Sequence, residues 1–171
     1  MPYRGVTVFA EDTYGVLFHR KLIAGLENKK IIPRGKVRVK RLPSWTCNHS
    51  LRKKLAARVG AGEYKALIVV DSDNDPEKAR ENILRHLENW PVPFSIVTVD
   101  PRHETWLCIG MGLDPRKCRR NPEAVIERHL NTVYEKRMLS TLSSKTSIDH
   151  LMNKNDFKKY IKELKRLLND P

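Results

Sequence analysis

Residues 66–77, ALIVVDSDNDPE, decide the class of fold. The stretch opens with five apolar residues in a row, three of them β-branched, which is typical of a strand buried on both faces inside a parallel sheet. The strand ends on Asp71, and Asp73 follows two positions later, so the two carboxylates leave the strand on the same side, roughly 6.5–7 Å apart along the chain. Because ligands of open α/β sheets bind at the carboxyl ends of the strands, this pair predicts a site for a hard divalent cation such as Mg²⁺.

The acids of this stretch also have structural interpretations. Asp75, Pro76 and Glu77 are typical of a helix start, with Asp as N-cap, Pro at the first helical position and Glu in the first turn. Aspartate is also common in turns, although a turn does not require two acids at the end of an apolar strand. We therefore expect Asp75 to cap a helix, and Asp71 and Asp73 to bind a metal ion.

Three known motifs share features with the same stretch. An EF-hand loop that starts at Asp71 requires Gly at its sixth position and Glu at its twelfth, where this chain has Pro76 and Asn82. A Walker B aspartate requires an upstream GxxxxGK[ST] loop, which the sequence lacks. Phosphatases of the haloacid dehalogenase type have Thr or Val where Asp75 stands, and they carry the motif on their first strand. A small-molecule phosphatase or phosphotransferase therefore stays as the weaker enzyme alternative.

The composition predicts a soluble protein with one core and at most a small appendage. Of the 171 residues, 40% are hydrophobic and 31% are charged. No apolar run approaches the ~20 residues that span a bilayer, and the N-terminus leads directly into a strand pattern without a signal peptide. The protein has three cysteines, an odd number that cannot all pair within one chain, and none of them is spaced as in a CxxC motif. They are Cys47, Cys108 and Cys118. This usage favours a reduced cytoplasmic compartment and argues against a zinc site.

The net charge of +13 favours a polyanionic partner, above all nucleic acid, either DNA or RNA. The alternative is the charged surface of a thermophile protein, since the chain is rich in Lys, Arg and Glu and contains no Gln. That alternative explains many charges but not a surplus of one sign. The charge does not itself define a site.

Strands and helices alternate outward from the central stretch. Strand patterns occur at 5–10, which ends at Glu11, at 36–40, which alternates apolar and charged residues, and at 94–99, which ends at Asp100. Strand–helix repetition of this kind gives right-handed βαβ units and a mostly parallel, four-stranded sheet. The helices predicted between the strands begin at Asp12 or Thr13, at Ser50 and at Asp75.

Two clusters of basic residues are candidates for contacts with nucleic acid. On the alternating strand, three cations would lie in a row on one face, an arrangement equally typical of an edge strand protected from aggregation. The second cluster belongs to a basic loop predicted over 113–122. Helices are predicted to follow over 122–135, 147–153 and 156–168, the last with an apolar face suited to packing on the sheet. The first cluster consists of Lys36, Arg38 and Lys40, and the second of Arg116, Lys117, Arg119 and Arg120.

The acids at the predicted strand ends, together with Glu104 shortly after the fourth strand, resemble the Toprim family. Members of that family carry a Glu after the first strand and a DxD motif after a later one, on a small α/β sheet. The resemblance implies that Asp71 and Asp73 bind Mg²⁺ or Mn²⁺, with Glu104 as a further ligand. It implies a catalytic role for Glu11 as general acid and base.

The resemblance extends to the second half of the chain. Residues 104–107, ETWL, are similar to the acidic-aromatic segment of OLD-type nucleases and small stand-alone Toprim proteins. The resemblance to the Toprim family implies a Toprim-like, Rossmann-like α/β sandwich over residues 1–112. A basic loop with a helical C-terminal extension is expected over 113–171. One departure is that the family often has Gly soon after the first Glu, where this chain reaches Gly15 only after three other residues. Features similar to the helical tail of those proteins are Tyr134, Glu135, Lys136, Ile148, Asp149 and Phe157.

These observations predict a metal-dependent nuclease. One or two Mg²⁺ ions held by carboxylates can spread the charge of a phosphodiester over its oxygens, while surrounding cations hold the backbone without reading sequence. The alternative is a Toprim-like module that binds nucleic acid or a ribonucleoprotein without turnover. A protein partner or a second copy of the chain stays open, and no membrane partner is expected. At 171 residues we do not expect a full primase or topoisomerase.

Overall fold

The computed structural model describes residues 5–42, 65–87 and 93–170. In this part of the chain, four strands form one sheet in the order β2-β1-β3-β4, and every pair of neighbours is parallel. The expected α/β class and four-stranded sheet are confirmed. The helix predicted from residue 50 and the side chain of residue 47 lie outside the described residues. The strands are β1 (Val6–Ala10), β2 (Val37–Arg41), β3 (Lys65–Asp71) and β4 (Phe94–Val99).

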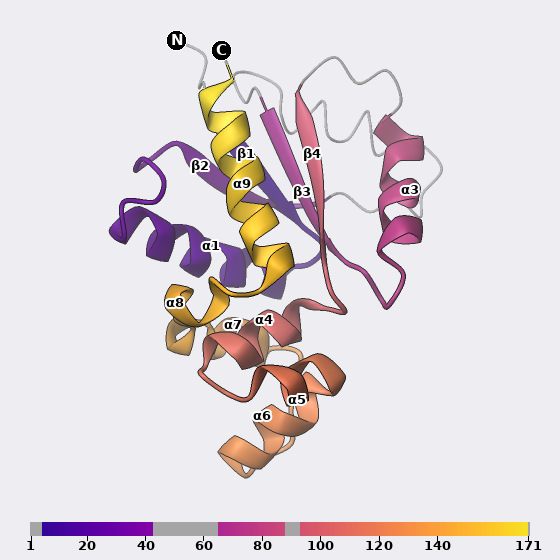
Figure 1. The fold of residues 1–171 in the computed structure, drawn as a ribbon, viewed down its shortest axis with the longest axis vertical. Helices are drawn as coiled ribbons and strands as arrows, with labels where there is room; N and C mark the ends of the chain where they lie inside the picture. The colour runs from indigo at the N-terminus through magenta and orange to yellow at the C-terminus, as the bar shows by residue number, and fades with distance from the viewer. Residues whose placement is uncertain (1–4, 43–64, 88–92, 171) are drawn as a thin grey trace.

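Helices cover both faces of the sheet, as Figure 1 shows. On one face lie α1 (Thr13–Asn28) and α9 (Asn155–Asn169), and on the other lies α3 (Pro76–Leu87). Alternate residues of β3 serve the two layers: Leu67 and Val69 pack towards α1 and α9, while Ile68 packs towards α3. Burial on both faces is the physical reason for the unbroken apolar run in β3.

Two helix starts follow the capping chemistry expected from the sequence. The Asp12 carboxylate accepts a hydrogen bond from the backbone N–H of Gly15, at 2.7 Å, at the start of α1. The Asp75 carboxylate accepts one from the backbone N–H of Lys78, at 3.1 Å, and Pro76 is the first residue of α3. Caps of this type stabilise a helix by about 1 kcal/mol each.

A group of short helices lies beyond the carboxyl end of the sheet (Figure 1). The prediction of a basic loop over 113–122 is wrong, because Pro115–Arg120 forms a helix, α5. Asp114 caps it by accepting from the backbone N–H groups of Arg116 and Lys117, and Pro115 takes the first helical position. The helix expected over 122–135 ends earlier, where Asn131 adopts a left-handed conformation. The other helices here are α4 (His103–Gly110), α6 (Pro122–Leu130), α7 (Met138–Thr141), the 3₁₀ helix Ser143–Lys145 and α8 (Ile148–Leu151).

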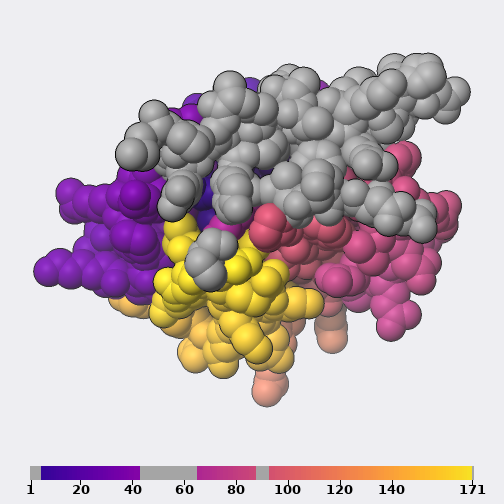
Figure 2. Space-filling model, turned by 90° about the horizontal axis from the view of Figure 1, so that it is seen from above, coloured from indigo at the N-terminus to yellow at the C-terminus, as the bar shows by residue number. Residues whose placement is uncertain are grey.

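The last helix, α9, packs on the sheet as its apolar periodicity predicted. Phe157, Tyr160, Ile161 and Leu164 are buried as expected, while Leu167 is buried in place of the expected Leu168, which is half-buried. The side chains of α9, α1 and the sheet belong to one continuous hydrophobic cluster. Seen from above, the surface of α9 lies between the N-terminal elements and α3 (Figure 2). A separate boundary at residue 112 remains a prediction.

The buried Lys65 side chain, at the start of β3, holds the C-terminal end of α9. Its ammonium donates to the carbonyl oxygen of Leu167, at 2.6 Å, and to that of Asp170. These carbonyls belong to the last turn of the helix, where the backbone has no partners of its own. A buried cation at this end also complements the helix dipole.

Cys108 of α4 and Cys118 of α5 form a disulfide, with their Cα atoms 5.7 Å apart. The expectation of unpaired cysteines is therefore wrong. The two residues lie ten positions apart and meet only because α4 packs on α5. Disulfides are rare in the cytosol, except in hyperthermophiles, so cysteine usage no longer supports the expected cytoplasmic location. Among the described residues, no helix has the length and apolar character needed to cross a membrane.

Candidate active site

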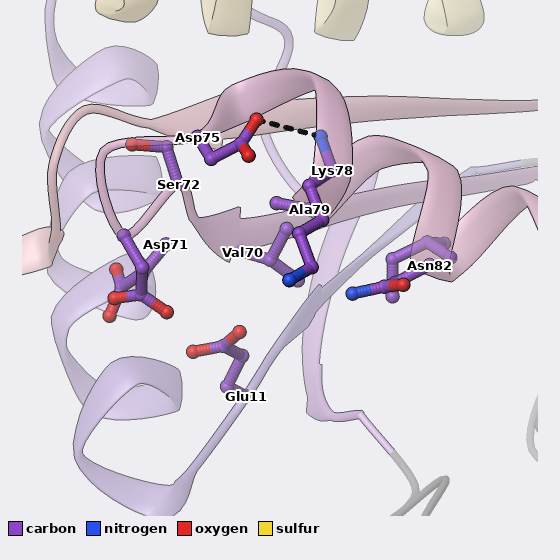
Figure 3. Close-up of a pocket in the computed structure, with 10 residues that line it drawn as sticks. Glu11, Val70, Asp71, Ser72, Asp75, Lys78, Ala79 and Asn82 are labelled. Atoms are coloured by element: carbon purple, nitrogen blue, oxygen red, sulfur yellow. Dashed lines mark hydrogen bonds between the residues drawn. The ribbon is translucent and has the colours of Figure 1, made fainter.

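The parallel pairing of β1 and β3 brings two of the predicted acids to one edge of the sheet. Ala10 of β1 pairs with Val69 of β3, so Glu11 follows β1 close to the point where β3 ends on Asp71. Both residues line a pocket of about 470 Å³, and their carboxylates are turned towards the same space in Figure 3. Asp73 lines this pocket as well. The other lining residues are Val70, Ser72, Asp75, Lys78, Ala79, Asn82 and Ile83.

Asp71 is anchored through a single oxygen. Its Oδ1 accepts hydrogen bonds from the backbone N–H of His103, at 2.8 Å, and from ring Nδ1 of the same residue, at 2.6 Å. No hydrogen bond from another described residue reaches Oδ2. Burial raises the pKa of Asp71, but the electrostatic interaction and hydrogen bonds with His103 outweigh burial and leave the pKa below its ordinary value. Asp71 is thus an ionised carboxylate whose Oδ2 accepts no hydrogen bond from the described residues.

Glu11 has the opposite electrostatic character. Although the residue is exposed, desolvation of its carboxyl group raises its pKa, and the negative charge of Asp71 raises it further, to about 7. The electrostatic interaction with His103 opposes this shift. A carboxyl group with a pKa near neutrality can accept or donate a proton under physiological conditions.

Asp73 lies in the tight turn between β3 and α3. Its φ of 50° and the φ of 65° at Asn74 place two consecutive residues in the left-handed region, which Asp and Asn tolerate better than most residues. Its backbone N–H donates to the carbonyl of Pro101, at 3.0 Å, while its side chain is exposed at the pocket. Both expectations for Asp73, turn residue and metal ligand, are compatible with this position.

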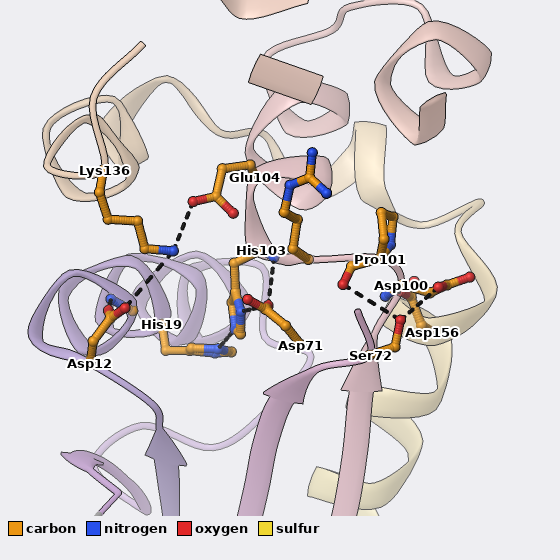
Figure 4. Close-up of polar contacts among 12 residues, drawn as sticks. Asp12, His19, Asp71, Ser72, Asp100, Pro101, His103, Glu104, Lys136 and Asp156 are labelled. Atoms are coloured by element: carbon orange, nitrogen blue, oxygen red, sulfur yellow. Dashed lines mark hydrogen bonds and ion pairs between the residues drawn. The ribbon is translucent and has the colours of Figure 1, made fainter. Parts of the chain in front are cut away.

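Glu104 lies in a polar cluster beside the pocket rather than among its lining residues. The residue is 2% exposed, and its Oε1 accepts from Lys136 Nζ at 2.8 Å and from the Tyr134 hydroxyl at 3.2 Å. Its Oε2 is buried and has no hydrogen-bond partner among the described residues. Lys136 Nζ also lies 3.8 Å from a carboxylate oxygen of Asp12, and Figure 4 shows it reaching across between the two acids.

Two buried histidines behind Asp71 were missed by sequence reasoning. His103 Nε2 lies 2.8 Å from His19 Nε2, and His19 Nδ1 lies 3.0 Å from the Tyr160 hydroxyl. Burial, and then the nearby His103, lower the pKa of His19 well below its ordinary value. Burial also lowers the pKa of His103, but Asp71 outweighs this effect and leaves a net rise. The available signal was the position of His19 between apolar residues of an amphipathic helix.

The predicted basic clusters lie on two different elements. Lys36 and Arg38 are exposed and Lys40 is half-buried, and the last two line a groove of about 460 Å³ beside α1. All four basic residues of the second cluster are exposed on α5. Arg119 lines a hollow together with Asn74, which neighbours Asp73. The α5 cluster therefore extends to the rim of the site.

The donor atoms of the site suit a hard divalent cation, but they do not form a complete ligand set. Among the described residues, no three His, Cys, Asp or Glu side chains are grouped so as to hold a metal ion. What the site offers is the free Oδ2 of Asp71, the Glu11 carboxyl group and the exposed Asp73, all oxygen donors of the type that Mg²⁺ prefers. Burial, and then repulsion from the charge of Asp71, raise the pKa of Glu11, and a bound cation would relieve the repulsion.

Comparisons with protein-family models, with curated proteins and with solved structures gave no match. The resemblance to the Toprim family therefore depends on the chain's own residues, namely Glu11, Asp71, Asp73 and Glu104. The parallel sheet and the shared pocket are observations independent of that resemblance.

Proposed function

We propose that the protein is a Toprim-like nuclease that cleaves phosphodiesters of nucleic acid with Mg²⁺ or Mn²⁺. The observation that carries this proposal is the pairing of two carboxyl groups of opposite character in one pocket. Asp71 is ionised, and its Oδ2 has no hydrogen-bond partner in the described part of the chain, while Glu11 in the same pocket has a pKa of about 7. An ionised metal ligand and a group that exchanges a proton near neutral pH are the two kinds of group that metal-assisted hydrolysis of a phosphodiester uses.

The roles follow from these characters. Asp71, through Oδ2, and Asp73 would hold the cation, which when bound supplies positive charge to the phosphate oxygens. Glu11, in its ionised form, removes a proton from the attacking water and, once protonated, donates one to the leaving oxygen. Support for Glu104 as a further ligand is its buried Oε2, which lacks a partner among the described residues. Burial of an unpaired carboxylate oxygen is costly, and a cation would compensate it.

A polynucleotide is the substrate best supported by the charge. The net charge of +13 attracts phosphates at any sequence, and Arg119 extends the basic surface of α5 to the turn that contains Asp73. The groove beside Arg38 and Lys40 is a second candidate path for the backbone. A small phosphorylated substrate would need few of these cations.

The test is cleavage of labelled single- and double-stranded DNA and RNA by the full chain, with Mg²⁺, with Mn²⁺ and with EDTA. Asp71→Asn and Glu11→Gln should each abolish metal-dependent cleavage, a loss of at least about 10²-fold for a general base. The matched control is Asp149→Asn, which changes an exposed acid on α8 and should leave cleavage unchanged. Wild type that cleaves none of these substrates with either metal would overturn the proposal.

The second candidate is a module that binds nucleic acid without cleaving it. It is favoured by the two hydrogen bonds from His103 to Asp71, which are equally compatible with a structural acid. Such a module would bind DNA or RNA without any metal ion. Its affinity would fall steeply as the salt concentration rises, because binding to phosphates releases counterions. A phosphatase acting on small molecules would lack that salt dependence.

A further inference from the structure

A buried chain of hydrogen-bonding side chains leads from the pocket into the hydrophobic core. It starts at Asp71 on β3, continues through His103 on α4 and His19 on α1, and ends at Tyr160 on α9 (Figure 4 shows its first three members). The contacts measure 2.6 Å, 2.8 Å and 3.0 Å in that order. The four residues come from four separate elements, so the chain is a tertiary feature.

The contacts, together with the ionised state of Asp71, favour one arrangement of the protons. An ionised carboxylate only accepts, so His103 must carry a proton on Nδ1 to make its 2.6 Å contact with Asp71. In a neutral His103 ring, Nε2 then has no proton, and His19 must donate from its own Nε2. His19 Nδ1 is in turn an acceptor, and the Tyr160 hydroxyl donates to it. Every donor thus points towards Asp71.

The reversed order leaves a buried donor without an acceptor. If both nitrogens of His103 carried protons, His19 would accept at Nε2 and donate from Nδ1 to the Tyr160 oxygen. The Tyr160 hydroxyl hydrogen would then have no acceptor among the described residues, in a side chain that is fully buried. An unpaired buried donor is destabilising, and buried polar groups are rarely left so.

The surroundings keep this arrangement rigid. His19 and Tyr160 are both 0% exposed, and the rings of Trp106 and Phe18 pack around the two histidines at centroid distances of 6.0–6.2 Å. Water therefore has little access to replace a member of the chain. Because His103 contributes both its backbone N–H and its ring to Oδ1 of Asp71, rotation of the carboxylate would break two hydrogen bonds at once.

We propose that His103, oriented by His19 and Tyr160, is a positioning residue that holds Oδ1 of Asp71 against α4 and leaves Oδ2 to face the pocket. The role of Oδ2 as a metal-binding atom rests on the proposed function, whereas the orientation of the carboxylate does not. Partners of this kind fix the geometry of ligating carboxylates, and their loss typically weakens metal binding 10–100-fold. Through His19 on α1 and Tyr160 on α9, these hydrogen bonds also make α1 and α9 part of the support of the site.

The first test needs neither metal nor substrate. Long-range ¹H–¹⁵N correlation spectra of the ¹⁵N-labelled full chain distinguish the protonation forms of its six histidines. We expect His103 with its proton on Nδ1 and His19 with its proton on Nε2, and signals are assigned by their loss in His103→Asn. Tyr160→Phe should shift the Nδ1 signal of His19, whereas Tyr14→Phe, at a tyrosine that is 38% exposed, should not. A His103 that carries no proton on Nδ1, or a His19 signal that does not respond to Tyr160→Phe, overturns the positioning role.

The second test measures Mn²⁺ affinity by calorimetry in two complementary variants. His103→Asn keeps an N–H donor near the position of Nδ1, so it should retain most of the affinity. His103→Gln moves the donor towards the position of Nε2, away from Asp71, and should weaken binding by about tenfold or more. His129→Gln, at an exposed histidine of α6, is the control and should bind as wild type does. Equal losses in the Asn and Gln variants, or no loss in either, contradict a positioning role.

The two tests separate this proposal from the proposed function. Mn²⁺ binding with the expected affinity pattern but without cleavage overturns the nuclease function and supports the positioning of Asp71. Expected proton positions without any Mn²⁺ binding overturn the metal-dependent function alone. Where a variant at His103 fails to fold, the spectra of wild type and of Tyr160→Phe still decide the proposal.

Discussion

The acids of the pocket and the acids around Lys154 lie at the same edge of the sheet, but their charges are compensated very differently. Asp156, at the start of α9, accepts from Lys154 Nζ at 3.0 Å, from the backbone N–H of Asp100 at 2.9 Å and from that of Phe157 at 2.8 Å. Asp100 in turn accepts from the Ser72 hydroxyl, at 2.7 Å. We call this cluster of Asp100, Lys154 and Asp156 the α9 clasp.

In the pocket the same kind of charge is left incomplete. Asp71 is bonded through one oxygen, and Glu11 responds to its neighbours with a pKa of about 7. The clasp contains its own cation, bonded to Asp156, whereas the pocket is lined by four acids and a single lysine. The acids are Glu11, Asp71, Asp73 and Asp75, and the lysine is Lys78. The comparison teaches that the charges of structural acids are compensated within the chain, while acids whose charges are only partly compensated at a strand end indicate a ligand.

The largest expected effect comes from breaking the clasp. Lys154→Met removes the only side-chain cation bonded to Asp156 among the described residues and leaves that half-buried carboxylate without its counter-charge. Removing one partner of a buried pair typically costs about 3–5 kcal/mol of the free energy of unfolding. Urea denaturation measures this loss, with Lys158→Met, at an exposed lysine of α9, as the control. A loss no larger than that of the control would show that the clasp is not structural.

A smaller, pH-dependent effect is expected from Glu11. Its pKa is about 7 in the folded protein against an ordinary value of 4.5, so between these values the folded state binds more protons than the unfolded chain. Stability should therefore fall as the pH rises from about 4.5 to 7, and the whole cost is present above pH 7. Asp71, with its lowered pKa, contributes the opposite trend, which is lost only as the pH falls below its ordinary value of 3.8.

Glu11→Gln removes the titration, so it should gain stability over wild type at pH 8 and lose that advantage at pH 4.5. Urea denaturation at both pH values measures the difference. Glu81→Gln, at an exposed residue of α3, should show no such change with pH. Added Mg²⁺ should reduce the advantage of Glu11→Gln at pH 8, because a cation stabilises the ionised acid. The same advantage at both pH values would mean that the pocket acids are compensated like those of the clasp.

The smallest effect on stability is expected from the basic surface of α5. Arg116, Lys117, Arg119 and Arg120 are exposed and form no ion pair with a buried acid of the described residues, so replacing all four by Ser should change the free energy of unfolding by about 0.5 kcal/mol per site at most. The same replacement should weaken nucleic-acid binding at low salt and reduce its salt dependence. Filter binding across a series of salt concentrations measures both. Unchanged binding would move the phosphate path to the groove beside Arg38 and Lys40.

Much of the sheet was predictable from local patterns. The apolar run before Asp71 identified β3, the alternation at 36–40 identified β2, and the period of α9 identified its buried face, apart from the exchange of Leu168 for Leu167. The error at α5 came from reading four basic residues as a loop, although Asp114 and Pro115 carried the signal of a helix start. The pairing of Cys108 with Cys118 had no comparable local signal.

The sequence alone was sufficient to predict that Glu11 and Asp71 stand at strand ends, because strand pattern and apolar burial are properties of short segments. Only the tertiary structure decided which strands are neighbours and so joined the two acids in one pocket. It also decided that His103, His19 and Tyr160 support Asp71, and that Lys154 neutralises Asp156. Such contacts join residues up to 141 positions apart, and no local preference encodes a meeting that depends on how whole elements pack.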